Sequence, residues 1–165
     1  MDLARILRHL CMTRWRVGLA FGPRVLRAID QAVRDSHTGH VARLHFAVEG
    51  ALHGAALLRH VSARERAIDV FSELRVWDTE QNNGVLVYLL LADRDVEIVA
   101  DRGISARVAP DEWERICQDM EAHFRRNEYE HGAITGVEQI TALLERHFPL
   151  QDSTRAEPPG APVIL

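Results

Sequence analysis

The feature that most constrains this fold is an uninterrupted apolar segment in the middle of the chain, Val85–Leu91. Its side chains do not alternate between apolar and polar, which is typical of a central β-strand covered on both faces. Ala92–Asp95 then turns the chain, and Val96–Asp101 predicts a second strand that returns beside the first as a hairpin. A strand buried on both faces needs helices on both sides of its sheet. We therefore expect a layered α/β protein.

A third strand and a connecting helix precede this hairpin. Residues 41–48 carry apolar side chains on one face and arginine and histidine on the other, which predicts a strand. Ser62-x-x-Glu65 is a capping box that opens a helix over residues 62–76. A helix that connects two neighbouring strands makes them parallel, with a right-handed crossover. Strands 41–48 and 85–91 are therefore expected to pair in parallel.

Helical spacing of apolar residues predicts the remaining elements. These helices cover residues 3–11, 23–38, 110–124 and 133–148. The expected architecture is a small mixed β-sheet with helices on both faces, an α/β/α sandwich with the order α-α-β-α-β-β-α-α. We expect three parts in the chain: a basic N-terminal helix and linker over 1–22, an α/β domain over 23–148, and a disordered, proline-rich tail over 149–165.

Charge and composition exclude several classes of function. The chain has 165 residues, the size of one domain, and a formal net charge of −4. An acidic chain is a poor partner for nucleic acid, which favours basic domains. Every one of the 20 basic residues is arginine, so Schiff-base and P-loop lysine chemistry are excluded. The charge is uneven, because residues 1–27 hold six arginines and one acid.

The basic N-terminal helix has two interpretations. It could lie on an anionic membrane surface, or it could dock onto the domain or a partner, and its few apolar positions favour docking. Arg5 and Arg8 interrupt any signal-peptide core, and no apolar run approaches the roughly 18 residues of a spanning helix. We therefore expect a cytoplasmic protein without a transmembrane segment. Cys11 and Cys117 are expected to be buried, reduced thiols.

The hairpin topology brings polar residues together at one end of the sheet, which we name the loop end. Strand 96–101 returns beside the start of strand 85–91, and this places Asp101 next to the polar loop 77–84. Carboxylate and amide oxygens are the ligands that Ca²⁺ and Mg²⁺ prefer. The predicted metal ligands are Asp78, Glu80, Asn82 and Asp101. Alternatively, the loop serves only to cap the elements beside it.

Arg102 gives the loop end a group that could hold a phosphate, although an ion pair with Asp101 explains it equally. The loop does not fit an EF-hand, because Asn83 and Leu89 stand where that motif needs glycine and glutamate. The opposite end of the sheet is expected to gather Glu49, Asp93, Arg94 and Asp95. Ligands of open α/β sheets favour that opposite end. The loop end has more candidate ligands, and we prefer it.

Two consecutive segments carry a resemblance to a known family. Trp77–Leu91 and Asp93–Ile98 resemble the TPM domain, in which an acidic or amide residue precedes Asn-Gly-Val-Leu, an apolar strand, Asp-Arg and a second strand that ends in Gly-x-Gly. The motif positions are Asp78, Asn82, Asn83, Gly84, Asp93, Arg94 and Gly103. Here Asp101-Arg102-Gly103 replaces Gly-x-Gly, and Trp15–Phe21 lacks the acid that many members carry before the first domain helix.

The resemblance implies an α/β sandwich. It also implies a choice of activities, because some members are acid phosphatases, some bind divalent cations, and others are tethered to membranes and act through partners. We expect this chain to be an interaction module that works with a membrane-associated assembly and has a membrane-associated protein partner. The alternative is a divalent-metal-assisted acid phosphatase acting on phosphate esters, with Ca²⁺ or Mg²⁺ at the loop end and Arg102 on the phosphate.

Overall fold

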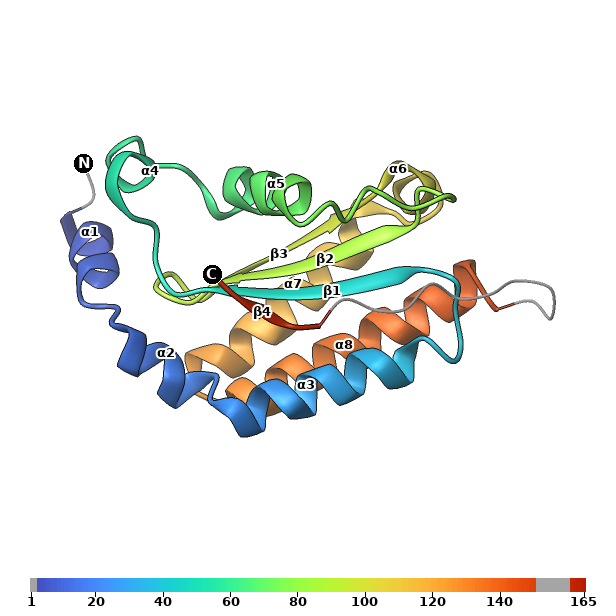
Figure 1. The fold of residues 1–165 in the computed structure, drawn as a ribbon, viewed down its shortest axis with the longest axis horizontal. Coiled ribbons are helices and arrows are strands. Elements are labelled where there is room, and N and C mark those ends of the chain that lie inside the picture. Colours follow the sequence, from blue (N-terminus) through green and yellow to red (C-terminus); the bar gives the residue numbers. More distant parts are fainter. Residues whose placement is uncertain (1–2, 151–160) are drawn as a thin grey trace.

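The computed structural model describes residues 3–150 and 161–165. The elements in chain order are α1 (Leu3–Leu10), α2 (Arg14–Ala20), α3 (Pro23–Ser36), β1 (Arg43–Glu49), α4 (Gly54–Leu58), α5 (Ala63–Glu73), β2 (Gly84–Leu90), β3 (Asp95–Ala100), α6 (Arg102–Ser105), α7 (Pro110–Arg125), α8 (Tyr129–His147) and β4 (Val163–Ile164). Figure 1 shows α5 on one side of the sheet and α3, α7 and α8 on the other. The predicted α/β architecture with helices on both faces is confirmed.

The sheet has the strand order β3-β2-β1-β4. β1 and β2 pair in parallel over their full length, from Arg43 opposite Gly84 to Glu49 opposite Leu90. β2 and β3 pair antiparallel as a hairpin. Both pairings agree with the expectation from the sequence. The hairpin geometry follows from the four-residue turn, which leaves no room for a crossover.

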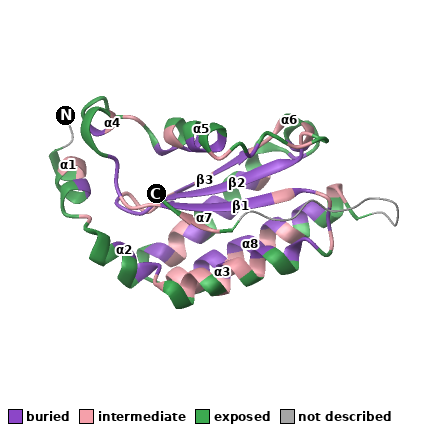
Figure 2. Ribbon diagram, viewed as in Figure 1, coloured by how far each residue is buried: buried purple, intermediate pink, exposed green. Residues whose placement is uncertain are grey.

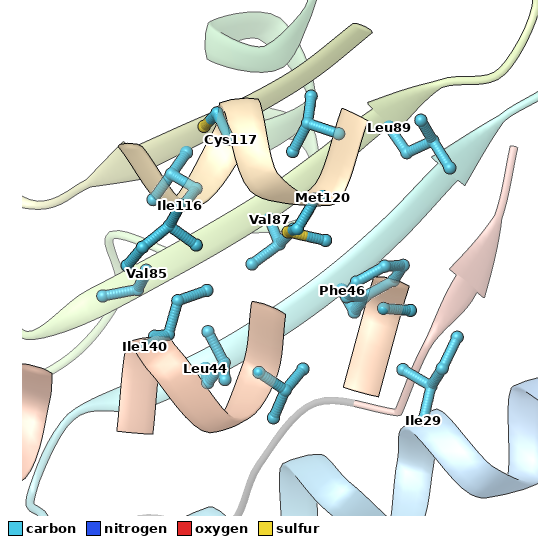
Figure 3. Close-up of a cluster of buried hydrophobic side chains, with 14 of the residues drawn as sticks. Ile29, Leu44, Phe46, Val85, Val87, Leu89, Ile116, Cys117, Met120 and Ile140 are labelled. Atoms are coloured by element: carbon cyan, nitrogen blue, oxygen red, sulfur yellow. The ribbon is translucent and has the colours of Figure 1, made fainter. Parts of the chain in front are cut away.

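The apolar run predicted as a central strand is buried at all seven positions of β2. Its side chains point alternately into two separate cores, one on each face of the sheet. Val85 and Val87 pack with α3, α7 and α8, as Figure 3 shows for the first of these cores. Leu86 and Tyr88 pack with α5. Burial on both faces explains why the sequence shows no alternation here.

Three local features differ from the prediction. The linker expected over 13–22 contains α2, whose first turn is capped by the Thr13 side chain. The disordered tail expected over 149–165 is wrong for Val163–Ile164, which form β4 on β1 in parallel, because β-branched residues suit an edge strand; residues 151–160 lie outside the described residues. Cys11 is exposed, contrary to prediction, whereas Cys117 is buried, and both are free thiols.

Candidate functional site

The turn between β2 and β3 holds Asp93, the carboxylate with the most side-chain hydrogen-bond donors in the described part of the chain. One oxygen of Asp93, Oδ2, accepts hydrogen bonds from Arg5 Nε at 2.8 Å and His9 Nε2 at 3.0 Å. The other oxygen accepts one from Arg8 Nη2 at 3.2 Å. All three donors lie on α1, so the N-terminal helix docks onto the domain at the carboxyl end of the parallel strands.

His9 is fixed between two partners. Its side chain is fully buried, and its Nδ1 accepts the backbone N–H of Leu52 at 2.9 Å. Nε2 therefore carries the proton and donates it to Asp93. Because both ring nitrogens are occupied, His9 holds the helix in place and is not available as a general base.

The charge environment matches this docking role. Burial alone would raise the pKa of Asp93, but the hydrogen bonds from Arg5 and His9 outweigh it and lower that pKa below its ordinary value. Arg5 also donates to the backbone carbonyl of Val61 at 2.9 Å. Sequence reasoning treated Asp93 as a turn residue and missed these partners. The signal available was the i, i+4 spacing of Arg5 and His9, which puts both on one face of the helix.

Docking by the charged face leaves three leucines of α1 exposed to solvent, whereas Ile6 packs against the core on the α5 side of the sheet. Leu3, Leu7 and Leu10 are 68%, 62% and 71% exposed, and Trp15 on α2 is 72% exposed. We name these four residues the arm surface, and α1 with α2 the arm. Figure 2 shows that the arm is mostly exposed, in contrast to the buried sheet beside it.

A second polar network lies on the α5 face at the same end of the sheet. Glu49 Oε2 accepts hydrogen bonds from Tyr88 Oη at 2.9 Å and Arg66 Nε at 2.8 Å. Burial is the largest cause of a raised Tyr88 pKa, so this phenol stays protonated and donates. Burial, followed by repulsion from Glu121, raises the pKa of nearby Asp95 to about 6.

At the loop end, the structure brings Asp101, Arg102, Gly103 and Asn82 together. Asp101 Oδ1 caps α6 by accepting the backbone N–H of Arg102 at 2.7 Å. The Arg102 guanidinium donates to Asn82 Oδ1 at 3.0 Å, and the Gly103 N–H donates to the Asn82 carbonyl at 3.0 Å. Asn82, Arg102 and Gly103 therefore hold the loop against α6, and Asp101 caps that helix.

Two oxygen atoms at the loop end are buried and have no hydrogen-bond donor among the described residues: Asn83 Oδ1 and Asp101 Oδ2. The Asn83 amide is oriented by its own donation to the Val41 carbonyl at 2.7 Å, which leaves Oδ1 as the acceptor without a donor. Gly84 has a packing role, because a Cβ there would collide with the backbone carbonyl of Val76.

Asp78 and Glu80 stand apart from this cluster as exposed loop residues. Within residues 3–150 and 161–165, no three histidine, cysteine, aspartate or glutamate side chains are grouped so that they could hold a metal ion. Three carboxylates at the loop end therefore do not gather as the topology suggested. Metal binding by Asp78, Glu80, Asn82 and Asp101 stays a prediction.

Comparison with known proteins identifies the family. The TPM domain matches residues 26–143. Among solved structures, the chain is similar to the BA42 protein of the psychrophilic bacterium Bizionia argentinensis, with a TM-score of 0.74 and 25% identity over 86% of this chain and 92% of that chain. It is also similar to the N-terminal domain of a P. gingivalis protein, with a TM-score of 0.51 and 25% identity over 78% and 79% of the two chains.

The curated proteins yield no significant match. None of the helices in the described ranges, 3–150 and 161–165, has the length and apolar character that crossing a membrane requires. The β2–β3 hairpin, with Asn83-Gly84 at its start and Asp93-Arg94 at its turn, lies within the matched range. The chain belongs to the TPM domain family.

Proposed function

We propose that this protein is an interaction module that attaches to the anionic lipid surface of a membrane-associated assembly through the arm surface. The observation that carries the proposal is the orientation of α1, which docks with its charged side against the domain. Its charged face is held by Asp93, and Leu3, Leu7 and Leu10 face outward.

The outward leucines are unfavourable in water. Burying one leucine side chain contributes about 1.5–3 kcal/mol, and α1 forgoes most of that gain at three positions. A contiguous apolar patch of this kind marks an interaction site on a soluble protein. Trp15 on α2 is exposed as well, and its ring is of the type that favours the boundary between lipid headgroups and acyl chains.

The charge around the arm surface favours an anionic lipid surface as its partner. Arg14 on α2, the neighbour of Trp15 in the chain, is exposed. Residues 1–27 carry six arginines against one acid, in a chain whose net charge is −4. Basic residues flanking leucine and tryptophan on short helices are typical of segments that lie in the headgroup region of acidic bilayers.

Co-sedimentation with lipid vesicles tests the proposal. We expect the protein to pellet with vesicles that contain phosphatidylglycerol and to stay in solution with pure phosphatidylcholine. Leu7→Ser/Leu10→Ser should abolish pelleting, because it removes half of the arm surface. Ile68→Ser is the matched control, since Ile68 is 47% exposed on α5, away from the arm.

Equal pelleting of the Leu7→Ser/Leu10→Ser variant and the wild type would refute the role of the arm surface. If the wild type binds native membranes but no protein-free vesicle, the surface belongs to a protein of that membrane and the lipid contact is wrong.

A second candidate function is a divalent-metal-assisted phosphatase, and one observation favours it. Asn83 Oδ1 and Asp101 Oδ2 are buried acceptors without donors among the described residues, and a cation could satisfy either of them. Mg²⁺ often takes one or two carboxylates and completes its shell with water. Arg102 lies beside this pair and could face a phosphate. Among residues 3–150 and 161–165, no nucleophile or general base accompanies these groups, which ranks this candidate second.

Calorimetric titration with Mg²⁺ and Ca²⁺ separates the two candidates. Binding by the wild type that is lost in Asp101→Asn, together with slower hydrolysis of p-nitrophenyl phosphate in that variant, would support the phosphatase. Absence of heat for both cations, with unchanged turnover in Asp101→Asn, would remove it.

A further inference from the structure

A pocket of about 710 Å³ opens between the arm and the β2–β3 turn. Its walls come from α1, α2, the β2–β3 turn and the start of α8, so segments far apart in the sequence meet there. It lies beyond the carboxyl ends of the parallel strands β1 and β2, where open α/β sheets bind their ligands. Its volume is in the range of pockets that hold small molecules.

The floor of this pocket is apolar. Leu91 and Ala92 directly follow β2 and are 3% and 7% exposed, and Ala20 of α2 lies beside them. Met12 and Leu19 extend the apolar lining toward the opening. An aliphatic group would therefore find the kind of surface that excludes water.

The rim of the pocket is cationic. Three guanidinium groups line it from three different segments: Arg8 from α1, Arg16 from α2 and Arg94 from the turn. Asp93 is the sole acid in the lining, and its oxygens already accept from Arg5, Arg8 and His9. The rim thus has an excess of positive charge.

Two of these arginines keep donors for a ligand. Arg16 makes no side-chain hydrogen bond or ion pair within the described part of the chain. Arg94 donates to the Arg125 carbonyl at 3.3 Å and to Asn127 Oδ1 at 3.0 Å, which fixes its side chain at the rim. A guanidinium has five N–H donors, so Arg94 still offers several.

We propose that this pocket binds an aliphatic anion, with its carboxylate or phosphate head between Arg16 and Arg94 and its chain on Leu91 and Ala92. Guanidinium groups form paired, charge-assisted hydrogen bonds with such heads. The inference goes beyond the proposed function and does not depend on it, because the arm surface faces outward and the pocket lies on the inner side of the arm.

Calorimetric titration with octanoate at low salt tests the pocket. We expect saturable binding to the wild type, no saturation with acetate, which lacks the chain, and none with octylammonium, which carries the opposite charge. Arg16→Ser should weaken octanoate binding about tenfold, the loss of one charge-assisted contact. Arg94→Ser should weaken it similarly, whereas Arg115→Ser, on an exposed part of α7, should bind like the wild type.

Arg16→Ser is the decisive variant, since the Arg16 side chain makes no hydrogen bond or ion pair within the described structure. Absence of saturable octanoate binding by the wild type would overturn the proposal, as would equal affinity in Arg16→Ser or equal binding of octylammonium.

Leu7→Ser/Leu10→Ser should keep octanoate affinity even though it loses vesicle binding, so failure of the arm surface and failure of the pocket give different results. Titration with octanoate in solution tests whether the pocket binds a free ligand. Loss of vesicle pelleting in Arg16→Ser/Arg94→Ser, with octanoate bound normally, would instead assign these arginines to a lipid headgroup and overturn the pocket.

Discussion

Replacing Asp93 with alanine removes the acceptor that holds the arm. The carboxylate is 11% exposed, its partner Arg5 is 15% exposed and the His9 ring is fully buried. Hydrogen bonds to a charged group contribute about 1.5–3 kcal/mol each, and Arg5 and His9 make two well-buried ones. Arg8 is 56% exposed and adds little because water screens it.

The free energies of these hydrogen bonds do not simply add, because the arm can detach from the domain in the variant. Breaking a buried ion pair costs about 3–5 kcal/mol when the remaining charge stays buried. In Asp93→Ala, release of α1 would return Arg5 and His9 to water and limit the loss. We therefore expect a fall in the free energy of unfolding of about 3 kcal/mol, measured by urea denaturation.

Hydrogen exchange would locate the change. The Leu52 N–H donates to His9 Nδ1, so its exchange should speed up when the arm leaves, by about 100-fold for a loss near 3 kcal/mol. Asp78→Ala is the control, because Asp78 is exposed and its side chain has no hydrogen bond or ion pair in the described structure. An Asp93→Ala protein with unchanged stability and unchanged Leu52 exchange would refute the reasoning.

The pH dependence gives an independent check. The folded pKa of Asp93 lies below its unfolded value of 3.8, so this stabilisation is present above that value and is lost as pH falls through the folded pKa. The difference between wild type and Asp93→Ala should therefore shrink in acid.

Three further substitutions test other parts of the fold. Asp95→Asn should stabilise the protein by about 1 kcal/mol at pH 7, because the folded pKa is raised to about 6 and the ionised form is disfavoured; the shift from 3.8 sets a ceiling of about 3 kcal/mol, which partial exposure reduces. That gain should vanish near pH 3, below both pKa values, and urea denaturation at the two pH values measures it. Gly84→Ala should cost about 3 kcal/mol or prevent folding, since its Cβ meets a backbone carbonyl, whereas Gly18→Ala meets nothing within 4 Å and should show no loss in thermal unfolding. Tyr88→Phe should lower the free energy of unfolding by about 1.5–3 kcal/mol, because Glu49 loses a buried donor; unchanged urea denaturation would contradict this.

The central fold could be predicted from the sequence because its signals are local. The β2 run is buried at every position, and the turn follows it directly. The hairpin and its burial could therefore be predicted without knowing any contact between residues distant in sequence. The capping box of Ser62 and Glu65 is present with both of its hydrogen bonds. The helix α2 was missed because seven residues with Gly18 among them give little periodic signal, although Thr13 is an ordinary N-cap.

The candidate site was harder to predict because it depends on pairs distant in sequence. Arg5 and Asp93 are 88 positions apart, and amphipathic spacing alone suggests that a helix docks by its apolar face. At the loop end, the topology correctly brought Asp101 near Asn82. Their oxygens are used in local hydrogen bonds, which the topology does not predict. Asp101 caps α6, and Asn82 Oδ1 accepts a hydrogen bond from Arg102.

The short strand β4 has a consequence for how the chain can be handled. Val163 and Ile164 pair with Ala47 and Val48, and the Leu165 N–H donates to the Val48 carbonyl at 2.9 Å. These few residues shield part of the outer side of β1. A protein shortened by them would present open amides and carbonyls there, and a sheet with such an open border invites strands from other molecules to join it. Deleting residues 163–165 should therefore increase self-association of the protein through β1.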